Sequence, residues 1–429
     1  MNAQPAERKE SPCVGNAAEQ LAARKQRILD AEQLRQPDRV PTYMPFLNLL
    51  YQLEGVSNAE LYNDPEKAHQ AMENAARRFQ PDMCESLFLT PGVSRALGDR
   101  MTRWPGYGLD DYGAYQYHEQ EYMKADDYDA FLADPSDWAI RRYLPRIFEE
   151  LGGLAMLPPM GLISKGALYF FGDAAVYAMP PIVKAAQALF KAGQEHLQWI
   201  QQMIALRKRL EAQGFLLGMY FEGSHCCAPF DHMADTLRGM RGIFTDMRRC
   251  PEKLLAAEEK VIPWLLESAA TVLHVRHNPY SFIPLHRGSD GFISLANFDK
   301  FYWPQLKRVI LALIEMGVTP VVLWEGVWDQ RLQYLAELPK GKTIGIFQAT
   351  DLVKAKQAIG DVMCIVGGMP NSLLVGGTPS EIREHTHKMC ETVGKGGGFI
   401  FSTEVGDLQG CKPELIEVWA EATREFGKY

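Results

Sequence analysis

Polar side chains able to do chemistry stand at the ends of several apolar runs in this sequence. Glu325 closes VTPVVLWE (318–325), whose apolar and β-branched residues are typical of a strand buried on both faces. Carboxylates and imidazoles at such positions can bind a divalent metal ion or transfer protons. The other runs that end in polar groups are followed by Glu222 with His225, by His286 with Arg287 and Asp290, by Gln348, and by Glu404.

Each of these groups also has a structural interpretation. Glu325 and Glu404 could form ion pairs with Arg or Lys, because buried carboxylates are almost always paired. His225 could cap backbone groups of a loop, and the adjacent Cys226-Cys227 pair fits small buried residues. The HVRH stretch (274–277) lacks the glutamate of a zincin motif, so we interpret it as the end of a helix.

The apolar runs alternate with amphipathic segments along the chain. Strands are expected at 39–46, 85–90, 214–223, 281–287, 319–326, 342–348, 361–368 and 397–404. Helices are expected near 59–79, 136–152, 183–213, 251–270, 295–316, 351–359, 379–394 and 413–427. This order predicts parallel strands with helical crossovers, an α/β fold, and about eight units favour a closed (β/α)₈ TIM barrel. The catalytic groups of such a barrel gather at the C-terminal ends of its strands.

The N-terminal part of the chain differs from the rest. Residues 1–17 are polar and aperiodic, and 18–35 have the pattern of a charged helix. We therefore expect an N-terminal extension over 1–37, packed outside the barrel or mobile, and a single catalytic barrel over 38–429.

Composition restricts the class of protein. Lys and Arg number 45 against 53 Asp and Glu, and this net charge of −8 argues against nucleic acid or an anionic membrane as the main partner. No run of 18 apolar residues is present, which predicts no transmembrane helix. Eight cysteines without a CxxC pair, and an N-terminus without an apolar signal core, predict a cytoplasmic protein.

Residues 348–382, QATDLVKAKQAIGDVMCIVGGMPNSLLVGGTPSEI, resemble the C-terminal half of the uroporphyrinogen decarboxylase superfamily. The shared features are a Gly-Asp pair that opens a strand and an L-x-x-G-T-P stretch that leads into a helix. APFDHMADTLRGMRGIFTDMRRCPEKL (228–254) and DGFISLANFDKFYWPQLKRVI (290–310) are similar to further family segments. The resemblance covers about 38–426 and implies the barrel fold. It includes both decarboxylases and cobamide-dependent methyltransferases.

The chain departs from the pattern of both branches. RVPTYMPFLNLLYQLEG (39–55) lacks the arginine pair with which the decarboxylases grip substrate carboxylates, which disfavours tetrapyrrole decarboxylation. Where the thiol methyltransferases carry His-x-Cys-Gly and a later Cys for zinc, this chain reads LWEG (323–326) and STEVG (402–406). Carboxylates in place of thiolates suit an oxygen-bearing substrate.

The resemblance therefore implies an O-demethylase-like methyltransferase. It would move a methyl group from a small methylated donor, such as an aryl methyl ether, to the cob(I)amide of a separate corrinoid protein. A decarboxylase of another acid, for which Arg287 and Arg95 could bind the carboxylate, and a transferase from methylcobamide to tetrahydrofolate or a thiol remain as alternatives. A homodimer is a possible assembly.

The expected site follows from this reading. A divalent metal, zinc by the resemblance, would be bound by Glu222, Glu325 and Glu404. The catalytic candidates are His225, His286, Asp290 and Gln348. The candidates for donor binding are Tyr220, Phe221, Trp324, Trp328, Phe347 and Arg287, although the aromatic members also fit ordinary barrel packing.

Overall fold

The computed structural model describes residues 16–85, 89–404 and 406–429. Its main sheet is parallel, with the order β11-β10-β9-β8-β7-β6. These strands are β6 (Ser224–His225), β7 (Tyr280–Leu285), β8 (Thr319–Trp324), β9 (Ile344–Phe347), β10 (Cys364–Met369) and β11 (Phe399–Thr403). A second parallel pair consists of β1 (Tyr43–Pro45) and β2 (Met83–Glu85).

Two isolated bridges close these sheets into a barrel. Thr42 pairs with Phe401 in parallel and joins β1 to β11. Cys84 pairs with Leu217 and joins β2 to the segment that continues into β6. The predicted (β/α)₈ barrel is thus confirmed, although the strand expected at 85–90 is instead β2 (Met83–Glu85), and positions 86–88 lie outside the described residues. The segment 214–223 was expected as a full strand, but it enters the ladder through Leu217 and through β6, which follows it directly.

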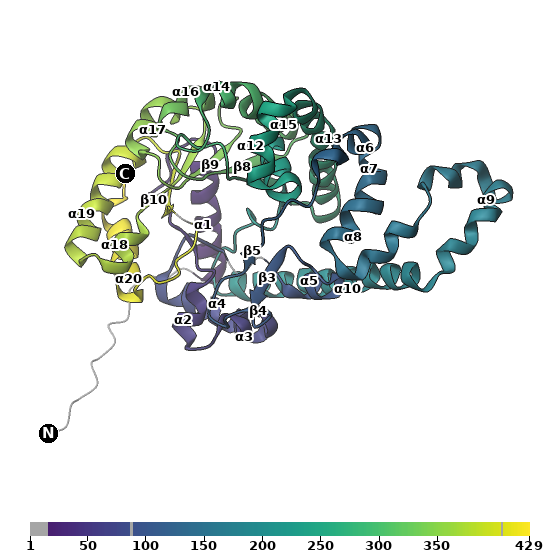
Figure 1. The fold of residues 1–429 in the computed structure, drawn as a ribbon. Coiled ribbons are helices and arrows are strands. Elements are labelled where there is room, and N and C mark those ends of the chain that lie inside the picture. Colours follow the sequence, from purple (N-terminus) through teal and green to yellow (C-terminus); the bar gives the residue numbers. More distant parts are fainter. Residues whose placement is uncertain (1–15, 86–88, 405) are drawn as a thin grey trace.

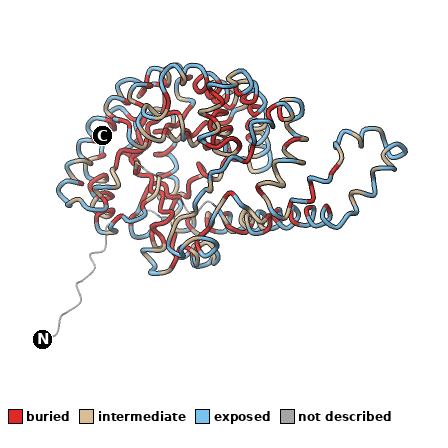
Figure 2. Tube along the Cα trace, in the orientation of Figure 1, coloured by how far each residue is buried: buried red, intermediate tan, exposed pale blue. Residues whose placement is uncertain are grey.

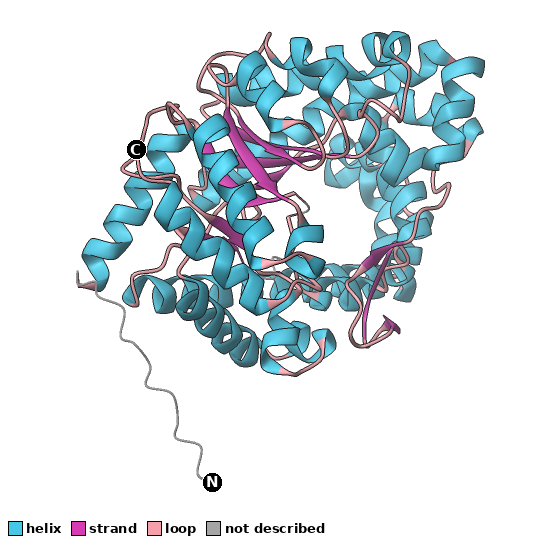
Figure 3. Cartoon of the chain, turned by 90° about the vertical axis from the view of Figure 1, so that its left-hand side faces the viewer, coloured by secondary structure: helices cyan, strands magenta, loops and turns pink. Residues whose placement is uncertain are grey.

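Helices surround the barrel. Figure 3 shows the strands at the centre with the helices around them. They include α4 (Pro65–Phe79), α10 (Pro180–Ala212), α13 (Pro251–Arg276), α15 (Trp303–Glu315), α17 (Leu352–Ile359), α19 (Pro379–Met389) and α20 (Pro413–Phe426). Side-chain caps define where two of them begin. Asp351 accepts hydrogen bonds from the first turn of α17, and Thr378 forms a capping box with Glu381 at the start of α19.

Side chains alternate between the two faces of each strand, because successive residues point to opposite faces. One set fills the barrel interior: Tyr43, Met83, Phe221, Phe282, Val321, Ile344, Ile346, Cys364, Val366 and Ile400. The alternate set, which includes Ile283, Leu285, Val322, Trp324 and Phe347, packs outward against the helices. These two layers form the core, seen as the buried part of the chain in Figure 2.

Helix α1 (Ala17–Glu32) covers the N-terminal end of the barrel. Its Ile28 and Ala31 belong to the interior cluster. Its last residue, Glu32, accepts hydrogen bonds from the hydroxyls of Tyr220 and Tyr280, the latter at 3.0 Å. Of the extension expected over 1–37, residues 16–32 therefore pack on the N-terminal end of the barrel, and residues 1–15 lie outside the described residues.

A long insertion separates β2 from the segment around Leu217. It carries a small sheet of β3 (Thr102–Pro105), β4 (Gly108–Leu109) and β5 (Gln116–Tyr117) beside the barrel. It also contains an arm, with α9 (Gly166–Ala174) at its tip, that projects away from the barrel before α10 returns (Figure 1). The single helix expected at 136–152 is instead α7 (Pro135–Trp138), a π-helical turn, α8 (Leu144–Ile147) and a 3₁₀ segment, Glu149–Met156.

None of the helices in the described ranges combines the length and the apolar character that a membrane-spanning helix needs.

Candidate functional site

A cavity of about 540 Å³ lies at the C-terminal ends of the strands. Alternate residues of β7 and its continuation, Phe282, Pro284 and His286, line one wall, and Leu323 and Glu325 of β8 and its end line the next. The strand period places these side chains on the same face. The remaining lining residues are Leu47, Asn48, Tyr62, Leu89, Ala114, Tyr115, Phe221, His225, Gly406 and Asp407.

His286 and two carboxylates form the chemical centre of this cavity. The imidazole Nδ1 lies 2.5 Å from Oδ2 of Asp235, and Nε2 lies 3.5 Å from Oε1 of Glu325. Asp235 comes from the π-helical turn His232–Arg238, which follows the end of β6 in the chain. The ring therefore bridges a carboxylate behind it and a carboxylate in the cavity.

This arrangement controls the charge of the histidine. Burial acts to lower the pKa of His286, but the hydrogen bond and charge of Asp235, with further charge from Glu325 and Asp231, raise that pKa to about 9. Burial raises the pKa of Glu325, while His286 acts to lower it. His286 is thus an imidazolium at neutral pH, with Nδ1 donating to Asp235 and a second N–H on Nε2.

Asp231 holds the end of β7 in place. Its carboxylate accepts hydrogen bonds from the backbone N–H of His286 at 3.0 Å and of Arg287 at 3.2 Å. The hydroxyl of Tyr302 donates to it at 2.6 Å. Burial and the charge of Asp235 raise the pKa of this carboxyl group. Asp231 therefore fixes the backbone of His286 and Arg287, and with it the starting positions of their side chains.

His225 lines the same cavity as His286 but differs from it in charge. Its Nε2 lies 3.0 Å from the carbonyl oxygen of Phe221. Burial lowers the pKa of this imidazole, and the charge of Arg276 acts in the same direction. The ring is neutral near pH 7, so it suits hydrogen bonding to a ligand better than it suits proton donation.

Two further polar groups at the cavity wall come from distant parts of the chain. Asp407 accepts a hydrogen bond from the side-chain amide of Asn48 at 2.6 Å. Burial raises the pKa of the Tyr115 hydroxyl, and the charges of Asp407 and Glu325 raise it further. Tyr115 is therefore a neutral hydrogen-bonding group in the wall.

A second chamber of about 730 Å³ adjoins the first. Leu89, Tyr115, Phe221 and His225 line both of them. The second chamber continues between α10, α13 and the small sheet, and its own walls include Trp104, Trp199, His196, Val272 and Arg276. The lining of the first cavity contains no arginine or lysine within the described ranges, whereas the second chamber contains Arg276.

The expected metal site is not assembled. Glu222 forms an ion pair with Arg207 at 2.9 Å, and Glu325 faces His286. Glu404 is half-buried and does not line either chamber. No group of three or more His, Cys, Asp or Glu residues in the described part of the chain is placed to hold a metal ion. The three glutamates end different strands, but their side chains do not converge, so zinc does not fit them.

Asp290 and Gln348 have supporting positions and do not line either chamber. The side-chain oxygen of Gln348 accepts a hydrogen bond from the backbone N–H of Gly326 at 2.6 Å. Asp290 accepts one from the backbone N–H of Gln330 at 2.9 Å. Gln348 thus shapes the turn that carries Glu325, and Asp290 shapes the loop beyond it.

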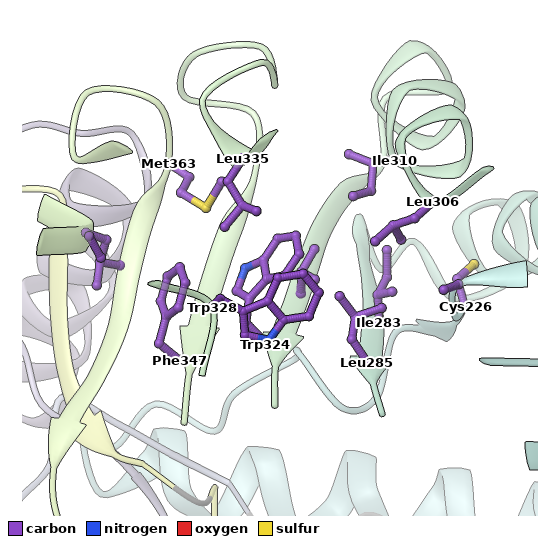
Figure 4. Packing of buried hydrophobic residues seen from close by; sticks show 14 of the residues in the cluster. Cys226, Ile283, Leu285, Leu306, Ile310, Trp324, Trp328, Leu335, Phe347 and Met363 are labelled. Carbon is purple, nitrogen blue, oxygen red and sulfur yellow. The ribbon is translucent and has the colours of Figure 1, made fainter. Parts of the chain in front are cut away.

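Most of the aromatic residues expected to bind a donor are core residues. Trp324, Trp328 and Phe347 pack on the outer face of the strands among residues of the surrounding helices (Figure 4). Tyr220 bonds to Glu32 at the opposite end of the barrel. Phe221 alone of the five aromatic residues proposed for donor binding lines the described chambers.

Arg287, also expected to bind a donor, is engaged by protein carboxylates. Its guanidinium group lies 3.0 Å from Asp235 and 3.0 Å from Glu119. Its role is to hold Asp235 beside His286.

The sequence interpretation missed Asp231, Asp235, Tyr115 and Asp407. The expected residues all lie in or near the ends of strands, whereas Asp231 and Asp235 lie in the helical segment after the end of β6. A signal was present, because two acidic residues spaced four apart in APFDHMAD lie on one side of a helix. Tyr115 and Asp407 lie in irregular segments, where no periodicity marks them.

Comparison with known proteins supports this fold. The family model described as uroporphyrinogen decarboxylase (URO-D) matches residues 177–426. A uroporphyrinogen decarboxylase from Pseudoalteromonas translucida is 27% identical over 139 residues, 32% of this chain and 39% of that protein. One from Methylococcus capsulatus is 29% identical over 119 residues, 28% of this chain and 33% of that protein. The aligned part of the chain thus spans between a third and two fifths of the length of these relatives.

A solved structure, a methyltransferase from Methanosarcina mazei, has the same fold along nearly the whole chain. The TM-score is 0.59 at 12% identity, with 94% of this chain and 98% of that chain covered. At this identity, the likeness concerns the fold alone.

Proposed function

Because the chain belongs to the uroporphyrinogen decarboxylase family, and its cavity places a charged histidine between two carboxylates, we propose that it is a methyltransferase. The proposed donor is a small methylated compound of the aryl methyl ether class. The proposed acceptor is the cob(I)amide of a separate corrinoid protein, which supplies the nucleophile.

The position of His286 in the cavity, between Asp235 and Glu325, carries this proposal. Demethylation of an ether breaks the methyl carbon–oxygen bond and leaves the electron pair on oxygen, and a phenolate or alkoxide leaves more easily when it receives a proton. The imidazolium, with a pKa raised to about 9, holds such a proton on Nε2 beside the cavity. Glu325, 3.5 Å from Nε2, keeps the ring charged until the donor oxygen takes the proton.

The walls suit the same chemistry. Phe221, Phe282, Pro284 and Leu323 exclude water from the donor and accept a planar apolar group. A substrate with several carboxylates at the reacting centre would need cationic side chains beside it. The described lining of this cavity contains no arginine or lysine, which argues against such a substrate. The proposed proton transfer is assigned to His286 and Glu325, and no step is assigned to a metal ion.

Methyl transfer to free cob(I)alamin tests the proposal. Purified protein is incubated anaerobically with methoxybenzenes and methoxybenzoates, and methylcobalamin formation is followed by its absorbance. We expect no turnover with donor alone and turnover when cob(I)alamin is added. Release of CO₂ from a carboxylic acid without any cobamide would establish the decarboxylase alternative instead, and transfer from methylcobalamin to tetrahydrofolate or a thiol would establish the third.

Two glutamate variants locate the reaction. We expect Glu325→Gln to lower kcat/KM by about 10²-fold, a scale typical of positioned acid–base groups. Glu404→Gln is the matched control, and it should retain activity because its side chain does not line either chamber. Equal losses in both variants, with unchanged unfolding midpoints, would favour the glutamate metal site over the histidine mechanism.

A further inference from the structure

The second chamber extends the reaction cavity in one direction. The two spaces, of about 540 and 730 Å³, share a wall of four residues that includes Phe221 and His225. A donor whose methyl group lies near His286 and Glu325 can therefore extend past His225 into the second chamber. The combined space exceeds the needs of a simple methyl ether.

The walls of the second chamber suit an aromatic body. Trp104 packs edge-on against Tyr62 and lies against Tyr115, with ring centroids 5.3 Å apart in each pair. Trp199 stacks on the ring of His196, with centroids 5.7 Å apart. Aromatic rings arranged in this way bind flat apolar groups with favourable geometry.

Polar atoms without a partner also occur in this wall. Trp104 is 3% exposed and Ser224 is 2% exposed, yet neither Nε1 of Trp104 nor Oγ of Ser224 has a hydrogen-bond partner among the described atoms. Buried polar groups in folded proteins are generally satisfied, so each such exception requires an explanation. Both atoms are closed off from solvent, so the anchor for a ligand must come from a side chain that the chamber exposes.

Arg276 is the one cationic side chain in the described lining of the two chambers, apart from histidines. It belongs to the last turn of α13. Its guanidinium group donates to Nε2 of His196 at 2.8 Å and to the carbonyl oxygen of Glu222 at 3.4 Å. Burial and the charge of Arg276 lower the pKa of His196, which keeps that ring a neutral acceptor.

Arg276 has N–H donors that are not used in the two hydrogen bonds described above. A guanidinium group carries five N–H donors, and the two contacts above use two of them. Within the described residues, no carboxylate lies at salt-bridge distance from Arg276. Glu222 is near enough for the charge of Arg276 to act on its pKa, in the lowering direction, but its ion pair is with Arg207. An arginine in an aromatic chamber without a carboxylate partner has the chemistry to bind an anionic group in a bidentate manner.

We infer that Arg276 anchors an anionic group of the donor, a carboxylate on the aromatic ring, so that the enzyme prefers methoxybenzoate-type acids to neutral methoxybenzenes. This inference rests on the proposed function for the identity of the donor. Arg276 acts as a binding residue at the far end of the substrate, and His286 and Glu325 act at the methyl ether.

Binding and turnover with paired ligands test the inference. The ligands are 4-methoxybenzoate, its demethylated product 4-hydroxybenzoate, and neutral methoxybenzene, each titrated by calorimetry and assayed with cob(I)alamin. In Arg276→Gln we expect Kd and KM for the two acids to rise at least 10-fold, with those for methoxybenzene changing less than 3-fold. Arg276→Lys should recover part of the affinity because it keeps the charge.

Lys260→Gln is the matched control, since it removes an exposed positive charge from the same helix. It should leave all the constants unchanged, and unfolding midpoints verify that each variant is folded. Equal effects of Arg276→Gln on acids and on methoxybenzene, or no effect on either, would overturn the inference.

The binding titrations separate this inference from the proposed function. If the acids bind in an Arg276-dependent manner but no methyl transfer occurs with any donor, the anchor stands and the methyltransferase proposal fails. If methyl transfer occurs and acids bind no better than neutral ethers, the anchor fails and the methyltransferase proposal stands.

Discussion

The hydrogen bond between His286 and Asp235 determines the ring's charge, and this has a consequence for pH dependence. Because His286 has a pKa of about 9, its proton-donating form is present below that value and is lost above it. We expect kcat/KM to fall as pH rises through about 9. In Asp235→Asn the principal partner that raises the pKa is removed, so the fall should move toward the ordinary histidine value of about 6.5.

The pH profile of kcat/KM and an NMR titration of the imidazole measure this shift. A merely structural role of Asp235 would lower activity at all pH values without moving the profile. An unchanged profile in Asp235→Asn would rule out the assigned donor. Asp351→Asn, a helix cap away from the two chambers, is the control for a lost carboxylate.

At the residue scale, the sequence predicted the residues that line the cavity better than the residues that hold them in position. His286, Glu325, His225 and Phe221 were expected because each follows or ends an apolar run, and all four line the chambers. Asp235 contacts His286 from 51 residues away in the chain, and no local pattern encodes that contact. The glutamates expected to bind a metal do not converge, because the sequence locates the ends of strands but not the direction in which their side chains point.

At the scale of elements, the contact between α1 and the barrel depends on buried charges. Asp82 is fully buried and lies 2.5 Å from Arg27 of α1 and 2.7 Å from Arg39. Despite burial, which acts to raise it, the charges of both arginines and the backbone hydrogen bond from Thr42 lower the pKa of Asp82. The carboxylate therefore contributes stability above its unfolded pKa of about 3.9, and that stability is lost as pH falls through the lower, folded value.

We expect Asp82→Asn to lower the free energy of unfolding by about 1.5–3 kcal/mol at neutral pH, because Arg39 loses its carboxylate and the buried Arg27 keeps only its pair with Asp38. Urea unfolding followed by circular dichroism measures the effect. Asp361→Asn, which breaks the exposed pair with Lys340, should leave the midpoint unchanged. A midpoint for Asp82→Asn equal to that of the control would show that α1 does not depend on this pair.

The eight strands were predictable as elements because each is an apolar run between helices with clear starts, such as Asp351 and Thr378. Which face of a strand points inward was not predictable. A strand buried on both faces has apolar residues at every position, so alternation does not identify the inner set. Trp324 and Phe347 were therefore expected in the site and lie instead in the outer layer.

At the scale of the whole molecule, the chain is a barrel with one large insertion that supplies part of the site. Trp104 and Tyr115 of the insertion line the second chamber, although they lie far in sequence from His225 and Arg276. The sequence predicted the barrel from its repeated units, but the part of the insertion that carries Trp104 and Tyr115 belongs to none of the expected strands or helices. Its contribution to the chambers could only be found in three dimensions.

The projecting arm contributes little to the stability of the barrel. Its tip is drawn mostly as exposed in Figure 2. Leu168 is 81% exposed and Tyr169 is 73% exposed. The two legs of the arm meet at its base, where a Cβ atom on Gly153 would lie 2.1 Å from the carbonyl oxygen of Pro181. The hydroxyl of Tyr177 also lies 3.3 Å from the sulfur of Met160, so the ends of the tip are close in space.

We therefore expect that replacing residues 161–175 by a Gly-Ser-Gly linker leaves the barrel folded, with a Tm within about 2 °C of the full chain, since little apolar surface leaves the core and a short loop closes the gap. Differential scanning calorimetry measures the midpoint, and the cob(I)alamin assay tests whether the site is retained. The control keeps the arm and carries the substitution Leu154→Ala at its base. Leu154 is buried, so the loss of its side-chain packing should lower the free energy of unfolding by about 2–5 kcal/mol. A larger loss of Tm in the deletion than in Leu154→Ala would mean that the tip stabilises the molecule through contacts outside this chain's own barrel.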